Sequence, residues 1–383
     1  NSAAITVASG APATTISTPV ALSAATATVA VNSTNGLTLG GAVSGTVLTK
    51  SGTGSLLLSA SNTYTGATTV SAGVLRVQND AALGSTAAGT TVASGAALEL
   101  NGGVAVGLES LNLSGTGVSN GGALRNIAGA NTYGGALTLA ADSRINTDAG
   151  SLNLSSTTAV TGNFALTVGG SADTTIAGPL NVGSLMKDGS GNLTLTGSGG
   201  TMAGSLTAAG GEVRLTGTLS SASAVNVNNG GTLLLGGSST NRIADAAAVA
   251  VGNSTTSGTL GFLGGLSGAS EALGALTLNM DSILDFGNGS GNTLTFASIT
   301  LGANFNSLKI YNWSGSFYSS TATTDPGTNL NQDRLLFSNL TGLTSQQLGQ
   351  ITFFSDNGLT AIGTATQVGF GGFGQAELVP VPE

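Results

Sequence analysis

The 383-residue sequence contains no cysteine and no histidine, only six prolines, and only 7 % charged residues. Without cysteine, the chain can form neither a disulfide framework nor a thiolate metal site. Without histidine, a serine hydrolase of the Ser-His-Asp type lacks its base. Residues 117–121 fit the nucleophile pattern Gly-x-Ser-x-Gly around Ser119, but for this reason we interpret them as a turn.

Basic clusters and long apolar runs are missing as well. The net charge is −8 and the nine Lys and Arg residues are scattered singly, which argues against a nucleic-acid partner. No apolar run approaches the ~18 residues that a membrane helix needs, so no membrane span is expected. The first residues, NSAAITVASG, have neither the basic nor the apolar region of a signal peptide, as in a chain already trimmed of its leader.

What the sequence has in quantity is glycine, with 62 residues, together with short apolar pairs such as Leu152/Leu154 and Leu193/Leu195. These pairs recur at short and nearly regular intervals along the middle of the chain. Two leucines that flank one residue lie on the same face of a β-strand. Strands this short bury their apolar face only when successive coils stack. We therefore predict an all-β fold, a parallel β-solenoid (β-helix) of roughly 10 to 15 coils if each coil takes two such intervals.

One layout occurs twice, at residues 48–77 and 185–215. The first copy has Lys50, Gly52, Gly54, Leu56 and Leu58, and the second has Lys187, Gly189, Gly191, Leu193 and Leu195. Residues 50–59, 62–70 and 73–75 resemble the autotransporter-associated β-strand repeat. This resemblance implies a parallel β-solenoid in a secreted or surface-exposed bacterial protein.

Three regions are expected along the chain. Residues 1–31 are rich in Ala, Thr, Ser and Val and form an N-terminal strand arm that pairs either with its own first coil or with a neighbouring molecule. Residues 32–304 form one uninterrupted β-solenoid repeat domain, because no Pro-rich or charged linker divides them. Residues 305–383 form a C-terminal cap with ten of the sixteen aromatic residues. This cap contains one helical turn, predicted from a capping box between Thr344 and Gln347, with Leu348 and Ile351 on one face.

The C-terminal region carries a second resemblance. The segments LKIYNWSGSFYSS and AELVPVPE are similar to the end of exported bacterial proteins of the PEP-CTERM class. Val379, Pro380, Val381, Pro382 and Glu383 match the start of the signal of that class, and the sequence ends there. The resemblance implies export followed by release to, or retention at, the cell surface.

Candidate metal and cofactor residues are few. Asp281, Asp285 and Asn288 could offer oxygen ligands to calcium, but their spacing fits no calcium loop and these residue types are common in turns. Gly369, Gly371 and Gly374 fit Gly-x-Gly-x-x-Gly without the helix that a pyrophosphate needs. We therefore expect no cofactor, and no cofactor-binding or metal-binding residue.

Candidate catalytic acids are equally sparse. Glycoside cleavage needs a pair of nearby carboxylates, and pairs such as Asp142/Asp148 are interpreted as turn or surface acids. We therefore expect no catalytic residue, and a non-enzymatic structural protein of the bacterial surface or extracellular matrix that self-associates through its chain ends into a fibre.

The alternative is a cell-surface adhesin with an extracellular polysaccharide as its partner. Tyr311, Trp313, Phe317 and Tyr318 could stack on sugar rings. Packing inside the cap explains these aromatic residues equally well.

Overall fold

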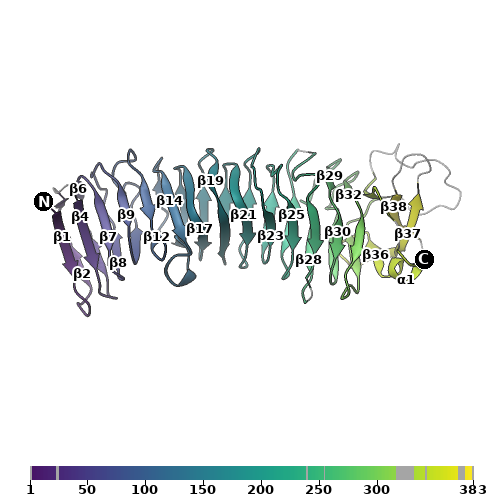
Figure 1. The fold of residues 1–383 in the computed structure, drawn as a ribbon, viewed down its shortest axis with the longest axis horizontal. Helices are drawn as coiled ribbons and strands as arrows, with labels where there is room; N and C mark the ends of the chain where they lie inside the picture. Colours follow the sequence, from purple (N-terminus) through teal and green to yellow (C-terminus); the bar gives the residue numbers. More distant parts are fainter. Residues whose placement is uncertain are drawn as a thin grey trace. The chain divides into compact units, whose positions relative to one another are not determined.

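The computed structural model describes residues 2–22, 26–238, 240–253, 255–315, 332–340, 343–369 and 376–381. The chain is 52 % strand and 2 % helix, and it contains about 13 turns of parallel β-solenoid, which confirms the predicted fold class. Its residues pack into two compact units, and each is treated separately below. The first unit contains residues 1–185 and 189–197, and the second contains residues 186–188 and 198–383. Figure 1 labels the strands of both.

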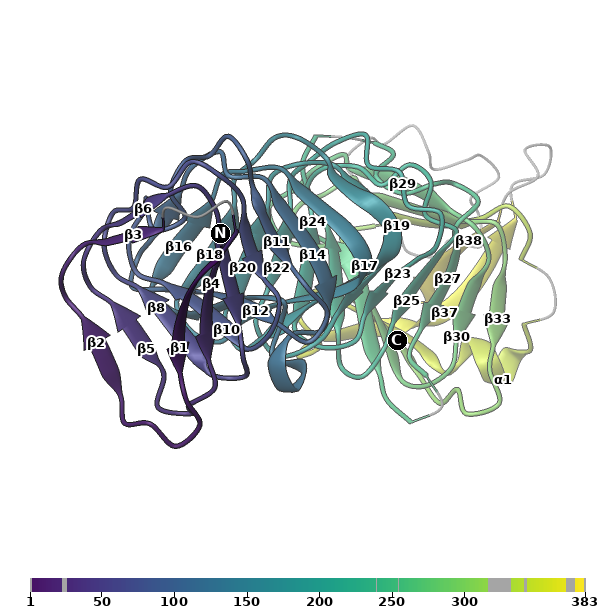
Figure 2. The ribbon, with the colours of Figure 1, turned by 60° about the vertical axis from the view of Figure 1, so that its left-hand side comes forward.

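Each early coil of the first unit contributes three strands. The first coil contains β1 (Ser2–Val7), β2 (Thr14–Ile16) and β3 (Val20–Leu22). These pair in parallel with β4 (Thr26–Val31), β5 (Leu37–Leu39) and β6 (Val43–Gly45) of the next coil. Figure 2 shows β3 and β6 on a different side of the coil from the other four strands. The N-terminal segment therefore pairs with its own chain, which is the intramolecular alternative raised by the sequence.

The ladders begun by β4 and β5 continue through the first unit in parallel register. The ladder of β4 continues with β7 (Leu48–Ser51), β9 (Thr68–Val70), β11 (Thr90–Val92), β14 (Leu111–Gly115), β17 (Leu137–Thr147) and β19 (Val160–Gly170). β19 also pairs with β21 (Leu180–Lys187). The ladder of β5 continues with β8 (Ser55–Leu58), β10 (Val74–Val77), β12 (Ala97–Asn101) and β15 (Leu124–Ala128).

The third side of the later coils has its own ladder. It consists of β13 (Ala105–Val106), β16 (Ala130–Tyr133), β18 (Ser151–Leu154), β20 (Asp173–Ile176) and β22 (Leu193–Leu195). The length of a coil varies along the chain, because Thr49 is the register partner of Thr69, whereas Asn112 is the register partner of Thr138. These two coils are 20 and 26 residues long, and the total of about 13 turns lies within the predicted range of 10 to 15.

The second unit repeats this arrangement. One ladder contains β23 (Ser205–Ala208), β25 (Ala224–Val227), β27 (Ala248–Val251), β30 (Leu276–Leu278) and β33 (Ile299–Leu301). A second contains β24 (Glu212–Leu215), β26 (Thr232–Leu235), β28 (Gly258–Phe262), β31 (Ser282–Asp285), β34 (Leu308–Tyr311) and β36 (Ile351–Phe354). A third contains β29 (Ser270–Leu273), β32 (Thr293–Phe296) and β35 (Arg334–Phe337).

Antiparallel pairing ends the second unit. β37 (Ala361–Gly369) pairs with β36 and with β38 (Ala376–Val381), and β38 pairs with β35. The predicted helical turn is confirmed as α1 (Ser345–Leu348), where the Thr344 hydroxyl accepts a hydrogen bond from the backbone of Gln347. Ile351, expected on the same helical face as Leu348, begins β36 instead. Parallel pairing extends beyond residue 304 into β34, β35 and β36, and the three predicted domain boundaries stay predictions.

The core consists of the inward-facing residues of each strand. In β22, Leu193 and Leu195 are 0 % and 3 % exposed, whereas Thr194 between them is partly exposed. The predicted strand register of this repeat is therefore confirmed. Full burial of one leucine side chain stabilises a fold by about 1.5 to 3 kcal/mol.

We predict that Leu193→Asp and Leu195→Asp each destabilise the fold by several kcal/mol, because each places an unpaired carboxylate in the shared core. Thr194→Asp is the matched control and should change the free energy of unfolding by less than about 1 kcal/mol. Chemical denaturation of the three variants measures this difference. Equal damage from Thr194→Asp would show that the assigned faces of β22 are wrong.

Candidate functional site

The repeated Lys-x-Gly-x-Gly segment forms a corner between two sides of a coil. Lys50 lies on the inward side of β7, and its side chain is 0 % exposed. Its ammonium donates to the carbonyl oxygens of Ser51 at 2.8 Å, Gly52 at 2.8 Å and Ala72 at 3.0 Å. Ala72 belongs to the corner of the following coil, so one lysine joins two successive corners. Burial lowers the pKa of Lys50 to about 8.

The glycines of this corner allow the coils to approach each other closely. Gly52 has a φ of 74°, a conformation that a side chain disfavours. A Cβ atom at Gly54 would lie 2.1 Å from the Ser33 carbonyl oxygen of the preceding coil. No other residue type fits there without a shift of the backbone.

The second copy of the segment has the same chemistry. Lys187 is 1 % exposed, and its ammonium donates to the carbonyl oxygens of Asp188 and Gly210. Gly189 has a φ of 72°, and a Cβ atom at Gly191 would lie 2.1 Å from the Ala172 carbonyl oxygen. The repeated motif is therefore a device for stacking coils.

The Asn-Thr-Tyr segment of the first repeat also joins coils. The side chain of Asn62 accepts a hydrogen bond from Val43 N at 2.8 Å and donates to the Ala82 carbonyl oxygen at 2.6 Å. The same tripeptide recurs at residues 131–133, where Asn131 accepts from Gly103 N and Val104 N. This second tripeptide was not predicted from the sequence, although its three residues are identical to those of the first repeat.

The two tyrosines of these segments belong to a buried polar cluster with Glu109. The Tyr64 hydroxyl lies 2.7 Å from Thr68 Oγ1, and Thr90 Oγ1 donates to Glu109 Oε1 at 2.8 Å. Glu109 and Tyr133 are each 1 % exposed, and neither Glu109 Oε2 nor the Tyr133 hydroxyl has a hydrogen-bond partner among the described residues. The pattern of glycine and leucine in the sequence did not predict this cluster, because the cluster depends on which coils become neighbours.

Burial controls the protonation of this cluster. Desolvation raises the pKa of Glu109, and the hydrogen bond from Thr90 opposes this effect. Desolvation also raises the pKa of Tyr133 and of Tyr64, and the charge of Glu109 adds to both shifts. A negative charge on Glu109 is therefore unfavourable in the folded chain.

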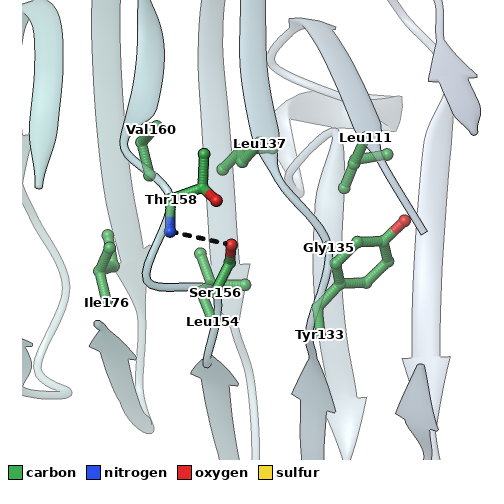
Figure 3. Close-up of a pocket in the computed structure, with 9 residues that line it drawn as sticks. All are labelled: Leu111, Tyr133, Gly135, Leu137, Leu154, Ser156, Thr158, Val160 and Ile176. Atoms are coloured by element: carbon green, nitrogen blue, oxygen red, sulfur yellow. Dashed lines mark hydrogen bonds between the residues drawn. The ribbon is translucent and has the colours of Figure 1, made fainter. Parts of the chain in front are cut away.

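A small cavity adjoins Tyr133 (Figure 3). It is lined by Leu111, Tyr133, Gly135, Leu137, Leu154, Ser156, Thr158, Val160 and Ile176. Its volume is about 10 Å³, which leaves room for about one water molecule. The lining is mostly aliphatic, and Ser156 accepts a hydrogen bond from Thr158 N at an exposed part of it. A cavity of this size cannot hold a sugar or an organic cofactor.

The predicted turn at Ser119 is a turn in the structure. Val118–Asn120 forms a short 3₁₀ helix between β14 and β15, and Ser119 is exposed with a φ of 52°. The Gly-x-Gly-x-x-Gly segment begins at Gly369, where β37 ends, and Gly371 and Gly374 lie outside the described residues.

The candidate acids are occupied by structural hydrogen bonds. Asp142 accepts from Ala165 N, Asp281 accepts from Asn306 and Ser307, and Asp285 accepts from Gly287 N and Asn312. Asp148 forms an ion pair with Arg125 at 2.6 Å. Among the described residues, no three Asp, Glu, His or Cys side chains converge as metal ligands would.

The aromatic residues of the C-terminal region pack against each other. Trp313 is 4 % exposed, and its ring contacts Phe286 and Phe353 at centroid distances of 5.1 and 4.8 Å. Tyr311 contacts Phe354 edge to face at 5.4 Å. Phe317 and Tyr318, the other two candidates for sugar stacking, lie outside the described residues, as do Pro382 and Glu383.

Corners of this kind, repeated along stacked coils, define the chain as a β-solenoid repeat protein. The passenger-associated-transport-repeat family matches the chain at residues 48–77 and 185–215, the two segments that share one layout. These two segments are thus repeats of the kind found in autotransporter passengers, and they support a surface-exposed or secreted passenger-type protein of bacteria. Searches of curated proteins and of solved structures found no match. Among the described residues, no helix is long and apolar enough to cross a membrane.

We predict that Lys50→Met lowers the free energy of unfolding by about 3 kcal/mol, because buried carbonyl groups lose their donor. Lys309→Met is the control, because Lys309 is exposed on β34 and should tolerate the change. Urea denaturation of both variants checks the prediction. A similar small effect in both would mean that the lysine is dispensable for the corner.

The raised pKa of Glu109 predicts a pH dependence of stability. The folded chain binds this proton more tightly than the unfolded chain, so stability falls as pH rises from about 4.5 through the folded pKa. Glu109→Gln removes this titration, and the variant should therefore gain stability relative to the wild type between pH 4 and pH 8, by about 1.4 kcal/mol for each pH unit that separates the unfolded pKa from the folded pKa. Glu271 and Asp333 titrate in the same sense in both proteins, so the difference between the two proteins is the quantity to measure. A difference that stays constant with pH would contradict the prediction.

Proposed function

We propose that this passenger-type protein is a non-enzymatic structural element of the bacterial cell surface or extracellular matrix, and that it self-associates end to end. The observation that carries the proposal is that the buried polar side chains of the protein bind its own backbone. Lys50, Lys187 and Asn62 each bind backbone groups of neighbouring coils. Their hydrogen bonds hold the fold together and are directed away from solvent.

The charged residues support the same function. Glu99 forms ion pairs with Arg76 at 2.7 Å and with Arg125 at 3.3 Å on the two adjacent coils. In the second unit, Arg242 and Glu271 form a pair at 3.2 Å that is almost fully buried. A catalytic acid needs to reach a substrate, whereas these carboxylates are engaged with guanidinium groups.

The first coil supports the end-to-end contact. Its inward residues Ile5, Ile16 and Val20 are partly exposed, while Val29, which pairs with Ile5 in the second coil, is 0 % exposed. Among the described residues, β1 pairs with β4 along one edge. An uncovered parallel edge is a template for another strand. Residues 2–22 include no charged residue that would oppose such pairing.

The adhesin with an extracellular polysaccharide as its partner is the alternative function. Its strongest aromatic candidate, Trp313, is buried between Phe286 and Phe353. This burial favours the structural role over sugar stacking at that residue.

The test combines electron microscopy with a variant of the first coil. We expect the purified chain to form filaments, and Ile5→Lys with Ile16→Lys to abolish them without unfolding the protein, because these inward but partly exposed positions of the first coil would place charges where the next molecule has to stack. Thr15→Lys, exposed on the outer face of β2, is the control and should leave filaments intact. Filaments that persist in the double variant would exclude this edge, and dispersed monomers of the wild type would exclude the fibre. Binding to isolated surface polysaccharide would favour the adhesin.

A further inference from the structure

The sequence contains six Asn-Gly dipeptides, and all of them lie in the described part of the chain. Asparagine is a thermolabile residue, because a backbone nitrogen can attack its side-chain amide. Glycine as the next residue favours this attack, since it has no side chain to hinder the approach. The dipeptides begin at Asn35, Asn101, Asn120, Asn229, Asn288 and Asn357. Six sites with the same local chemistry can therefore be compared by what the fold does to each.

Hydrogen bonds of the glycine N–H protect five of the six sites. In each of the five, the nitrogen that would attack donates to a backbone carbonyl oxygen. It has to leave this bond before it can turn toward the asparagine side chain. The pairs are Gly36 to Ser33 at 3.2 Å, Gly102 to Ala128 at 2.9 Å, Gly121 to Val118 at 2.9 Å, Gly230 to Ser257 at 2.9 Å and Gly358 to Asp356 at 2.8 Å.

The sixth dipeptide, Asn288-Gly289, is the exception. It lies in the corner between β31 and β32, and the Asn288 side chain is exposed. Within the described residues, neither the Gly289 N–H nor the Asn288 side chain takes part in a hydrogen bond. By contrast, the Asn35 side chain donates to the Ala11 carbonyl oxygen at 2.9 Å. Both reacting groups are therefore free of hydrogen bonds at Asn288.

We propose that Asn288 is a site of spontaneous deamidation, and that it reacts before the other five Asn-Gly sites. The Gly289 nitrogen loses its proton to water or hydroxide and bonds to Cγ of Asn288, and the Asn288 Nδ2 takes up a proton and leaves as ammonia. Water then opens the resulting cyclic imide at one of its two carbonyl carbons. Opening at one carbon gives aspartate, and opening at the other gives isoaspartate, in which the main chain runs through the former side chain. Water is the only co-reactant, and the inference does not depend on the proposed self-association.

The corner is poorly suited to the isoaspartate product. Isoaspartate lengthens the main chain by one CH₂ group, directly before Gly289. Gly289 lies so close to the preceding coil that a Cβ atom there would collide with the Leu266 carbonyl oxygen. The next residue, Ser290, accepts a hydrogen bond from Gly268 N at 2.9 Å, which also ties the corner to that coil. Deamidation should therefore weaken the stacking of these two coils as the protein ages.

Ageing of the purified full chain tests the proposal. The folded protein is incubated at mildly alkaline pH, and peptide mapping by mass spectrometry follows the conversion of each of the six amides to a carboxylate. We expect Asn288 to react about tenfold faster than any other Asn-Gly site, because each of the others first loses a backbone hydrogen bond. An equal or faster reaction at another of the six sites would overturn the proposal, as would an unmodified Asn288 in folded protein that has aged as long as a reacting unfolded sample.

Two substitutions identify the source of isoaspartate. Asn288→Gln should remove most of the isoaspartate that an isoaspartyl methyltransferase detects in the aged protein, because glutamine would have to close a larger ring. Asn35→Gln is the matched control, since Asn35 is also exposed and precedes glycine, and it should leave the yield unchanged. An equal loss in both variants, or no loss in Asn288→Gln, would contradict the assignment.

The same mapping in concentrated urea separates the effect of the fold from that of the local sequence. The unfolded chain has no hydrogen bonds that protect particular glycines, so all six sites should react at similar rates. If Asn288 kept its full lead in urea, the protection argued from the structure would be wrong.

The effect on the corner has its own measurement. Asn288→Asp carries the charge of the aspartate product without the longer main chain. Aged wild type that is rich in isoaspartate should therefore unfold at a lower urea concentration than fresh Asn288→Asp, whereas aged Asn288→Gln should unfold like its fresh sample. Equal unfolding midpoints for aged wild type and fresh Asn288→Asp would overturn the predicted weakening.

Discussion

The close approach of successive coils at their corners is the constraint on which the rest of this structure depends. Parallel pairing sets the distance between coils along every side, and the corners must keep the same distance. Gly54 meets this requirement, because any side chain there would collide with the Ser33 carbonyl. The turned backbone leaves carbonyl groups inside the corner, and the buried ammonium of Lys50 binds three of them. Lysine and glycine are thus needed together. Glycine leaves room for the neighbouring coil, and lysine donates hydrogen bonds to the carbonyl groups that the tight turn leaves inside the corner.

The buried polar groups set the register of the coils, and they do so at some loss of stability. A slip of one residue would turn every leucine outward, so the register needs strong definition. Asn62 defines it by hydrogen bonds to both neighbouring coils, and Glu271 does so by accepting from the backbone of Arg242 and Ile243. Burial raises the pKa of Glu271 and of Glu109, because a negative charge at either position loses its contact with water. Apolar replacements of such groups are often as stable, so specificity of stacking is the property that these groups supply.

Local features of the fold could be predicted from the sequence, whereas features that depend on coil length could not. The repeat, its inward leucines and the helical turn at Thr344 are each encoded within a few neighbouring residues, and all were predicted. The Glu109 cluster depends on partners that lie about a full coil apart in the sequence, and the length of a coil changes along the chain. Thr91 and Asn112 therefore show no common period with Thr138 in the sequence, although pairing places them in one column.

The outward residues are under different constraints from the residues of the core. An outward side chain on a solenoid contacts its two register neighbours and solvent, so stacking alone places few demands on it. On β10, β12 and β15 the outward residues alternate in charge and form ion pairs between coils. Arg76 and Arg125 are partly exposed and Glu99 is nearly buried, so these ion pairs mainly offset the desolvation of Glu99. The adjacent side of the same coils differs in charge, because Thr91 and Asn112 occupy the outward positions of β11 and β14. The core does not require this difference, so the outward positions vary in charge independently of the inward leucines.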